Sequence, residues 1–497
     1  MSVESIKKVA AQAPVVSKVN PPRTEAWGDD EHTDVGNARR MAKRYAGALA
    51  YVPTFGRWLE FAEHQWIEDS RGYIVQRAVA VTEDLLIESA RLTTEAAKVR
   101  DATVRAAMLA QAEAVFKWAK QSQSRQRIDA MVALARTEPA LAVEKARLDA
   151  DDFVLGVPNG LLELSATTTF RAGGPDDWIT RQSQATWQGE AECPQWKHFL
   201  AEVQPDPEVR HWLQMFVGYC LTGSCSEQVF LVLHGDGANG KGVFINTIKR
   251  LLGRYTEVVQ FQSFLEKRTD AIRNDLAKLD KARLVVAQEG PRGAVLDEGL
   301  VKQLTGQDEI AARFLYKDEF TFRPRFKIIL VANHKPVIQG TDLGIWRRVV
   351  LVPWNVTIPE GKRDRDLEAK LESELPGVLA WAVEGFHKWR EQGLSQLPEA
   401  IRHAKAEYQN ESDVIARWLE DAAELDDQMI SAGSAESSGH WATSADLVES
   451  HRQWCLTFGH RPFSEKALGD RLRKLGLAKG KQKGVRGWRG VRLKPSY

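Results

Sequence analysis

The feature that most constrains the fold of this chain is a set of four short apolar segments between residues 195 and 410. Their sequences are QVFLVLH (228–234), ARLVVAQE (282–289), FKIILVAN (326–333) and RRVVLVPW (347–354), and helix-forming sequence lies between several of them. Strands that are apolar on both faces are typical of a sheet covered by helices on both sides. The pattern therefore predicts an α/β domain with a mainly parallel sheet.

A glycine-rich segment, GDGANGKGVF (235–244), directly follows the first apolar run and leads into an amphipathic helical stretch. A strand, a glycine-rich loop and a helix in this order form the context of a phosphate-binding loop, in which backbone N–H groups and the helix dipole hold the phosphates. The expected contacts come from Gly235, Asp236, Gly237, Ala238, Asn239, Gly240, Gly242 and Val243, with Lys241 bridging the β- and γ-phosphates. The sequence predicts ATP as the ligand, with a structural turn as the alternative.

The ligands of a magnesium ion are incomplete in this sequence. Gly242 stands where a serine or threonine hydroxyl normally ligates Mg²⁺, and glycine has no side-chain oxygen. Glu289, at the end of the second apolar run, is the candidate carboxylate for orienting Mg²⁺ and polarising the attacking water; the alternative is a surface glutamate after a strand. Gln288 precedes it, where many such ATPases have a second acid. We therefore expect phosphates, water and Glu289 to hold the metal.

Polar residues flank the last two apolar runs. Asn333 ends the third run, and ligands of open α/β sheets gather at the carboxyl ends of strands, so its amide is predicted to contact the γ-phosphate or the attacking water. Arg347 and Arg348 begin the fourth run. One of them would act as an arginine finger on a neighbouring subunit, and the other would form an ion pair within its own subunit. The sequence leaves open which is which.

The chain before the sheet is predicted to consist of a flexible tail (1–25) and a largely helical region (26–190). Within that region, 26–85 has short strand-like pieces, and 86–150 is rich in Ala, Glu and Arg with helical spacing. The tryptophans of 58–66 are expected to lie in a core. Asp149, Asp151 and Asp152 follow a polar helical stretch and not an apolar strand, which argues against a polymerase-type metal pair.

The last part of the chain, 411–497, is predicted to be a winged helix. Helices are expected at about 443–457 and 464–475, followed by a glycine- and arginine-rich hairpin. Twelve Lys and Arg residues against two acids lie between 461 and 497, which suggests contact with a polyanion. The predicted DNA contacts are Arg471, Arg473 and Lys474 on the second helix and Lys481, Arg486 and Arg489 on the hairpin. The alternative is a protein-docking winged helix.

Cysteine content and hydropathy limit the cellular environment in which the chain is expected. The four cysteines form no CxxC pair, so neither a zinc site nor a disulfide framework is expected. The sequence has no apolar run of the length of a transmembrane helix, and no membrane partner is expected. A cytoplasmic location fits both observations.

Taken in order, these segments resemble the helicase part of the phage and plasmid primase-helicases, including the poxvirus and satellite-phage types of helicase superfamily 3. The resembling segments are 235–244, 284–289, 301–324, 327–336 and 340–354, and upstream 34–40, 157–164, 176–180 and 217–223. The resemblance implies a helicase-associated, collar-like region (26–190), an AAA+-like P-loop ATPase (191–410) and the winged helix (411–497).

The resemblance also implies a hexameric ring that pulls single-stranded DNA through its pore, usually 3′ to 5′. In that scheme Lys241 is the phosphate lysine, Glu289 the acidic residue, Asn333 the sensor and Arg347 or Arg348 the finger. Segments 310–316 and 319–327 would form a pore hairpin with Lys317 at its tip gripping DNA, and Arg313 as a weaker candidate. For Lys317 the alternative is an ordinary exposed turn lysine.

The sequence is compatible with three functions. The first is a replicative DNA helicase encoded by a phage or plasmid in a bacterial host; the second is a nucleotide-controlled, origin-binding initiator or clamp that does not unwind DNA. The third, a small-molecule kinase, is opposed by the basic C-terminal region and the paired arginines. Relatives often carry a primase domain upstream, whereas the residues before this ATPase resemble the helicase-associated region. A separate primase or polymerase is therefore expected as a partner.

Overall fold

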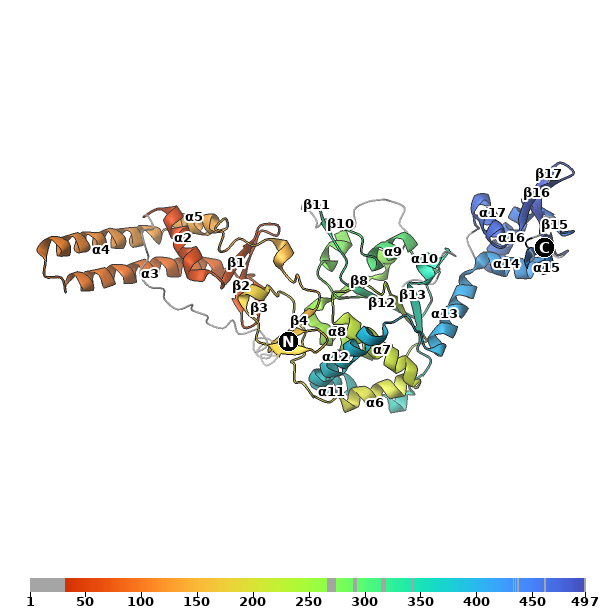
Figure 1. Cartoon of the computed structure of the whole chain (residues 1–497), viewed down its shortest axis with the longest axis horizontal. Helices are drawn as coiled ribbons and strands as arrows, with labels where there is room; N and C mark the ends of the chain where they lie inside the picture. Colours follow the sequence, from red (N-terminus) through yellow and green to blue (C-terminus); the bar gives the residue numbers. More distant parts are fainter. Residues whose placement is uncertain are drawn as a thin grey trace.

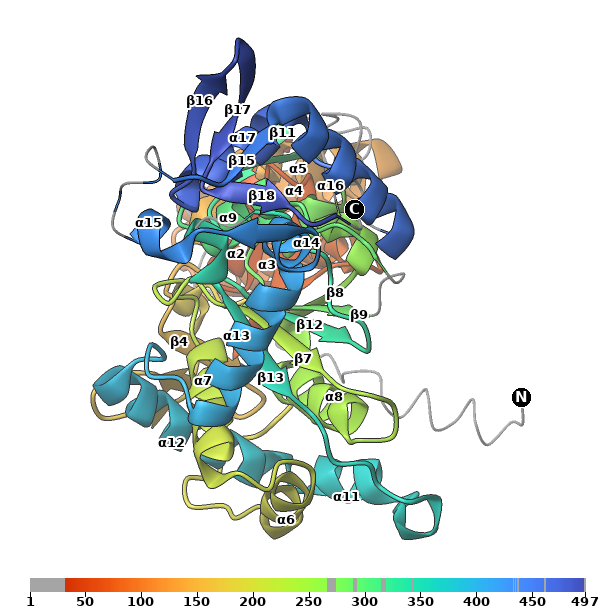
Figure 2. The same cartoon turned by 90° about the vertical axis from the view of Figure 1, so that its right-hand side faces the viewer.

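The computed structural model describes residues 32–265, 274–288, 293–313, 319–340, 343–431, 433, 435, 438–459 and 462–495. The described chain is elongated, with a helical hairpin at one end, a sheet-containing body in the middle and a small helical and β unit at the other end (Figure 1). Helix α13 (Glu399–Ser412) runs from the body to this last unit, as Figures 1 and 2 both show. No helix in the described part of the chain is both long and apolar enough to cross a bilayer.

The body is built on a five-stranded, entirely parallel sheet with the order β13-β7-β12-β9-β8. Its strands are β7 (Phe230–His234), β8 (Thr256–Gln260), β9 (Leu284–Gln288), β12 (Lys327–Ala332) and β13 (Val349–Pro353). The four predicted apolar strands are therefore confirmed as β7, β9, β12 and β13. Strand β8 was not predicted, because it lies at the edge of the sheet and its sequence, TEVVQ, is only partly apolar, with Val258 43% exposed.

Alternate residues of the strands enter two separate cores, one on each face of the sheet. Leu231 and Leu233 of β7 pack into the first core, whereas Phe230 and Val232 pack into the second. The first core also receives helices α6 (Pro194–Val203), α7 (Pro207–Cys220), α8 (Lys241–Leu252) and α12 (Leu375–Gln392). The second core receives α9 (Glu298–Thr305), α10 (Leu343–Trp346) and Tyr408 of α13. Burial of both faces explains why these strands lack the alternation of polar and apolar residues.

The N-terminal region combines helices with a small antiparallel sheet. Its elements are α2 (Asp34–Tyr45), β1 (Leu49–Val52), β2 (Arg57–Ala62), β3 (Gln65–Glu68), α3 (Tyr73–Ala96), α4 (Ala102–Ser122) and α5 (Arg125–Ala135). Helices α3 and α4 form the projecting hairpin of Figure 1. The long helices begin at Tyr73 and not near residue 86 as expected, because apolar positions such as Ile74, Ala78 and Val81 already pack at helical spacing. Trp58 and Trp66 are buried, which confirms their place in the core.

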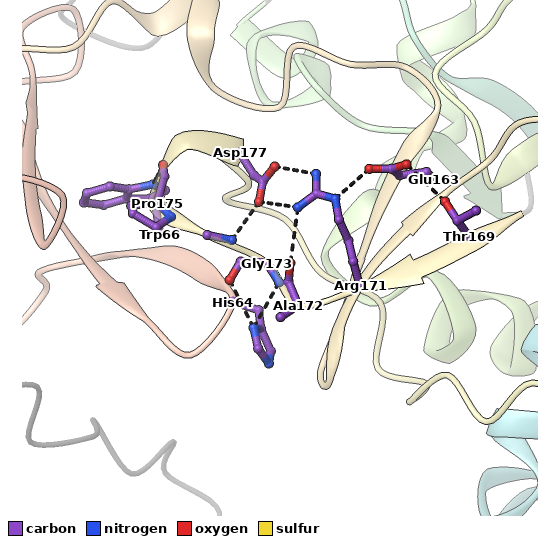
Figure 3. A network of polar contacts seen from close by, with 10 residues as sticks. His64, Trp66, Glu163, Thr169, Arg171, Ala172, Gly173, Pro175 and Asp177 are labelled. Carbon is purple, nitrogen blue, oxygen red and sulfur yellow. Dashed lines mark hydrogen bonds and ion pairs between the residues drawn. The ribbon is translucent and has the colours of Figure 1, made fainter.

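A second small sheet, β4 (Val154–Val157), β5 (Gly160–Glu163) and β6 (Thr169–Arg171), joins this region to the body. Figure 3 shows the polar network beside it. Arg171 donates from Nε to Glu163 Oε1 at 2.6 Å and from its terminal nitrogen to Asp177 Oδ1 at 2.6 Å. Trp66 of β3 donates to the carbonyl of Pro175 at 2.9 Å. The network therefore ties the two small sheets together.

The C-terminal unit has its own hydrophobic core, which includes Trp418, Trp454 and Trp488. Its helices are α14 (Val414–Ala422), α15 (Asp427–Ser431), α16 (Ser444–Phe458) and α17 (Glu465–Lys474), and its strands are β14 (Ala423–Leu425), β15 (Trp441–Thr443), β16 (Ala478–Gln482), β17 (Val485–Arg489) and β18 (Val491–Leu493). The two predicted helices and the antiparallel hairpin β16–β17 are confirmed as elements.

Candidate functional site

The glycine-rich turn, residues 235–240, connects the carboxyl end of β7 to the start of α8. Gly240 has φ +83°, and a Cβ atom there would lie 2.6 Å from Val203 Cγ1 of α6. A Cβ atom at Gly235 would lie 2.1 Å from the carbonyl oxygen of Trp354. Both glycines are therefore required by close packing. The Lys241 N–H donates to Asn239 Oδ1 at 3.5 Å, and the N–H groups of Gly242 and Val243 lie in the first turn of α8, where a helix can bind an anion.

Lys241 is folded back over this turn and is only 5% exposed. Its Nζ donates to the carbonyl oxygens of Gly235 at 2.6 Å and Asp236 at 2.9 Å, and to Asn239 Oδ1 at 3.1 Å. The Asn239 amide donates in turn to the carbonyl of Trp354 at 2.8 Å. Asn239 thus holds the lysine in place, a positioning role that the glycine-rich pattern alone does not reveal. A phosphate oxygen would have to replace one of these three acceptors, and the positive charge at the N-terminus of α8 favours such an exchange.

Several of the predicted residues gather at the edge of the sheet that carries this turn. Ala332 pairs with His234, and Val331 pairs with Gln288, so Asn333 continues β12 beside the turn. Burial, together with the charges of Lys335 and Lys241, lowers the pKa of His234 and keeps its imidazole neutral at pH 7. Glu289 follows Gln288 directly but lies outside the described residues.

The paired arginines lie at the opposite end of the strands from this turn, just before β13 begins. Val349 at the start of β13 pairs with Phe230, whereas Pro353 at its end pairs with His234 beside the turn. These two pairs are separated by about 13 Å of extended strand, and both arginines precede Val349. The structure therefore does not bring Arg347 or Arg348 to the turn of their own chain.

The two arginines differ in their surroundings. Arg348 is 8% exposed and donates to Thr305 Oγ1 at 3.1 Å and to the carbonyl of Gly344 at 2.7 Å. Arg347 is exposed and donates to the side-chain oxygen of Gln228 at 2.9 Å. Both arginines thus bond within their own chain, and they differ in that Arg348 is buried and Arg347 is exposed.

The residues expected to hold Mg²⁺ do not form a metal site within the described ranges. A Cβ atom at Gly242 would meet no atom within 4 Å, so the position is open but supplies no oxygen. In those ranges, no group of three or more His, Cys, Asp or Glu side chains is placed to hold a metal ion. Within those ranges, phosphate and water oxygens would therefore have to supply most of the ligands of a magnesium ion.

The hairpin expected between Glu289 and Asn333 is present. Strands β10 (Ile310–Arg313) and β11 (Glu319–Phe322) pair antiparallel, with Arg313 opposite Glu319. Arg313 is exposed at the end of β10 next to the connecting loop, and Lys317 lies outside the described residues. Lys145 of the N-terminal region lies with its Nζ 3.8 Å from the centre of the Phe320 ring and 2.6 Å from Asp280 Oδ2. This contact joins the hairpin to the N-terminal region.

The basic residues of the C-terminal unit fall into two groups. Arg471 forms an ion pair with Asp413, Arg473 pairs with Asp470 at 3.0 Å, and Arg489 contacts the carbonyl of Ser438 at 3.4 Å and lies over the Trp441 ring. Lys474, Lys481 and Arg486 are exposed and form no ion pair with any residue in the described ranges. Lys481 and Arg486 face each other across β16 and β17. Like charges in this position repel, and a bound anion relieves that repulsion.

Asp149, Asp151 and Asp152 do not form a metal pair. Asp149 is buried and accepts hydrogen bonds from the backbone of Thr180 at 2.8 Å and Arg181 at 3.2 Å. Asp151 accepts from the N–H of Phe153 at 2.8 Å, and Asp152 pairs with Arg325 at 3.1 Å. Each carboxylate thus has a structural partner, and the Asp152 pair with Arg325 links the N-terminal region to the body.

Comparisons with known proteins match two adjacent parts of the chain. A family model described as D5 N terminal like matches residues 38–205, and a family of unknown function (DUF5906) matches residues 233–348. A mimivirus protein named as a helicase, L207/L206 of Acanthamoeba polyphaga mimivirus, is 27% identical over an alignment of 392 residues, and the match covers 74% of this chain and 40% of that protein. The helicase-named 184R of Invertebrate iridescent virus 6 is 26% identical, covering 56% of this chain and 33% of its own length.

Two further similarities were found. A primase-named protein of African swine fever virus, C962R, is 22% identical over 153 residues, covering 30% of this chain and 16% of its own length. The NrS-1 C-terminal region has a TM-score of 0.49 at 9% identity, covering 90% of this chain and 96% of that structure. The chain spans less than half the length of these curated viral relatives.

Proposed function

Because the chain belongs to the phage and viral primase-helicase family, we propose that it is an ATP-driven replicative DNA helicase of superfamily 3. In this proposal identical copies form a hexameric ring that hydrolyses ATP and moves 3′ to 5′ along single-stranded DNA in its pore. The protein acts in the cytoplasm of the host cell with a separate primase or polymerase.

The observation that carries the proposal is the buried Lys241 ammonium above the glycine-rich turn, with Asn333 following the neighbouring strand at the same sheet edge. Lys241 and the N–H groups of residues 235–243 hold the triphosphate, and Asn333 contacts the γ-phosphate or the attacking water. Glu289 is assigned to water polarisation and to Mg²⁺. The metal supplies charge neutralisation on the phosphates when it is bound.

The proposed arginine finger, which one copy offers to the nucleotide of its neighbour, is inferred from the position of Arg347. Because it lies exposed at the far edge of the sheet, it can act only on the triphosphate of another copy. We assign the finger to Arg347 and a structural role to Arg348.

DNA contacts are proposed at two places. The β10–β11 hairpin, with Arg313 and Lys317, contacts the single strand in the pore. The C-terminal unit acts as a winged helix on duplex DNA, chiefly through Lys474, Lys481 and Arg486, which are exposed and form no ion pair within the described ranges. Arg473 and Arg489 contribute less, since each already has a partner, and Arg471 supports the helix through Asp413.

The test compares the full-length wild type with Lys241→Ala in two assays, ATP hydrolysis with and without single-stranded DNA and strand displacement from a tailed duplex. Lys249→Ala, also on α8 but one turn from its end, is the matched control. We expect DNA-stimulated hydrolysis and unwinding in the wild type and control, and neither in Lys241→Ala. A wild type without DNA-stimulated hydrolysis in the presence of Mg²⁺ would refute the proposal.

A second candidate function is a nucleotide-controlled origin-binding initiator or clamp. It is favoured by Gly242 and Gln288, which stand where other ATPases supply oxygens to the metal. Such a protein binds ATP and DNA, forms rings and leaves a tailed duplex intact. The strand-displacement assay separates it from the helicase.

A further inference from the structure

A cavity of about 660 Å³ opens beside the glycine-rich turn. Ala238 and Gly240 of the turn and Val243 of α8 form part of its wall. A larger cavity, of about 970 Å³, lies elsewhere in the described chain, is lined by other residues and does not touch the turn. Ligand pockets for molecules of nucleotide size have volumes of roughly 300–1,000 Å³.

Helix α6 forms the second wall of this cavity. Gln195, His198, Phe199 and Glu202 face it at helical spacings of three, four and seven residues. The helix is pressed against the turn, because a Cβ atom at Gly240 would lie 3.1 Å from Phe199 Cε2 as well as against Val203. This wall therefore has a fixed position relative to the phosphate-binding N–H groups.

The third wall is the segment 354–367, which we call the strap. The Ile358 N–H donates to the carbonyl of Ala238 at 2.8 Å, so the strap is bonded directly to the turn. Arg363 Nε donates to the carbonyl of Ile358 at 3.1 Å, so a side chain of the strap is bonded to the backbone of the strap. Ile358 and Leu367 are half-buried against the same core as α8 and expose their remaining surface to the cavity.

We propose that this cavity holds the adenosine part of the bound ATP; the inference rests on the proposed function. A triphosphate held over the N-terminus of α8 must place its nucleoside beside the turn, and Ala238 and Gly240 of the turn line this cavity. The base lies between Val243, Ile358 and Leu367, which exclude water. Glu202 and Gln195, on the exposed side of α6, offer hydrogen-bonding groups to its edge.

The proposal separates recognition of the nucleoside from recognition of the phosphates. Lys241 and the turn bind the triphosphate, whereas the strap and α6 contact only the nucleoside. Inorganic tripolyphosphate lacks the nucleoside, so it is a probe of the turn alone. Calorimetric binding of ATP and of tripolyphosphate to the full-length protein, at the same Mg²⁺ concentration, therefore distinguishes the two parts.

The test uses Ile358→Ala and Leu367→Ala. Each is expected to weaken ATP binding by about fivefold or more through lost apolar contact, with tripolyphosphate binding unchanged. The Ile358 N–H bond to Ala238 survives this substitution because it is a backbone bond. Leu397→Ala is the matched control, since Leu397 packs on the same core without lining the cavity, and it should change neither affinity.

Two results would overturn the assignment. Equal weakening of ATP and tripolyphosphate means that the strap only supports the turn. Unchanged ATP binding in both variants means that the nucleoside lies elsewhere. Failure of the proposed function itself looks different, because the wild type then binds neither ligand, or Lys241→Ala binds both normally.

Discussion

Lys241 and Arg347 lie at opposite ends of the same pair of parallel strands. At one end of the strands His234 pairs with Pro353, and Lys241 lies beyond this pair. At the other end Phe230 pairs with Val349, and Arg347 lies just before Val349. A side chain at the N-terminal ends of these strands cannot act on a phosphate bound at their C-terminal ends. Both residues therefore act on one triphosphate only when they come from two copies of the chain.

Arg347→Ala is expected to lower ATP hydrolysis by about a thousandfold without lowering the melting temperature, because an arginine finger stabilises transition-state charge and this side chain is exposed. Arg348→Ala should instead destabilise the protein by about 2 kcal/mol, since it leaves the buried Thr305 hydroxyl and Gly344 carbonyl without their donor. Thermal unfolding and steady-state hydrolysis measure the two effects.

Mixing the two inactive variants supplies the control for the finger. An Arg347→Ala copy still has an intact turn, and a Lys241→Ala copy still has an intact finger. Mixed assemblies should therefore regain part of the hydrolysis that each variant lacks alone. No recovery in assemblies shown to contain both variants would contradict a finger that acts between copies.

Two glycines of the turn should respond differently to substitution. Gly242→Ser is expected to leave ATP binding intact and to change hydrolysis modestly, because the added side chain enters open space. Gly240→Ala should destabilise the protein by about 2 kcal/mol or more and weaken ATP binding, since φ is +83° and the added Cβ meets Val203. Calorimetry with ATP and thermal unfolding check both. Loss of nucleotide binding in Gly242→Ser would show that this glycine is needed for close approach of the backbone.

The C-terminal unit should lose stability in acid because of His451. This side chain is 1% exposed, lies against Trp418 and Phe463, and burial lowers its pKa to about 4. Between pH 6.5 and 4 the unfolded state binds a proton that the folded state does not, so stability is complete above pH 6.5 and falls as the pH drops toward 4. The loss amounts to about 3 kcal/mol.

Hydrogen exchange of α16 measures this effect locally. The opening free energy of its amides, corrected for the intrinsic exchange rate, should decrease across that pH range in the wild type. His451→Gln should show a flatter profile, because the titrating group is gone. A wild-type profile as flat as that of the variant would exclude His451 as the cause.

The tip of the β16–β17 hairpin should carry salt-dependent DNA affinity. Replacing Lys481 and Arg486 with alanine is expected to reduce the slope of log affinity against log salt by about two, because each exposed cation that meets a phosphate releases about one counterion. Arg492→Ala is the control, since Arg492 is already paired with Glu424. Fluorescence anisotropy with a labelled duplex at several salt concentrations gives the slopes. An equal effect of Arg492→Ala would indicate net charge and not the hairpin tip.

The sequence was informative where local pattern decides structure. The strands β7, β9, β12 and β13 were predictable because burial on both faces leaves an uninterrupted apolar run. Strand β8 was not, because an edge strand with a half-exposed face has no such run. The start of α3 at Tyr73 does not follow the usual capping pattern, because Gly72 is its N-cap and the N–H groups of Tyr73 and Ile74 donate to Asp69 further upstream.

The site shows the same division between local and long-range information. The turn and Lys241 follow from the spacing of glycines within ten residues. The different fates of Arg347 and Arg348 depend on Thr305 in α9, far away in the chain, and no local pattern reports that contact. The α6 wall of the cavity was missed for the same reason, since α6 meets the turn only through tertiary packing at Gly240.

The first core of the sheet also decides where the molecule can be cut. Val157 and Leu162 of the small sheet β4–β6 belong to the same buried cluster as Phe244 of α8 and Trp354 of the strap. A fragment that folds on its own around the five-stranded sheet must therefore include β4 and begin near residue 150, ahead of the predicted boundary at 191. The C-terminal unit has a core of its own and is joined to the body by α13, so we expect it to fold when it is separated from the body. The parts of this protein that can fold separately are thus defined by their hydrophobic cores and not by where the sequence motifs begin and end.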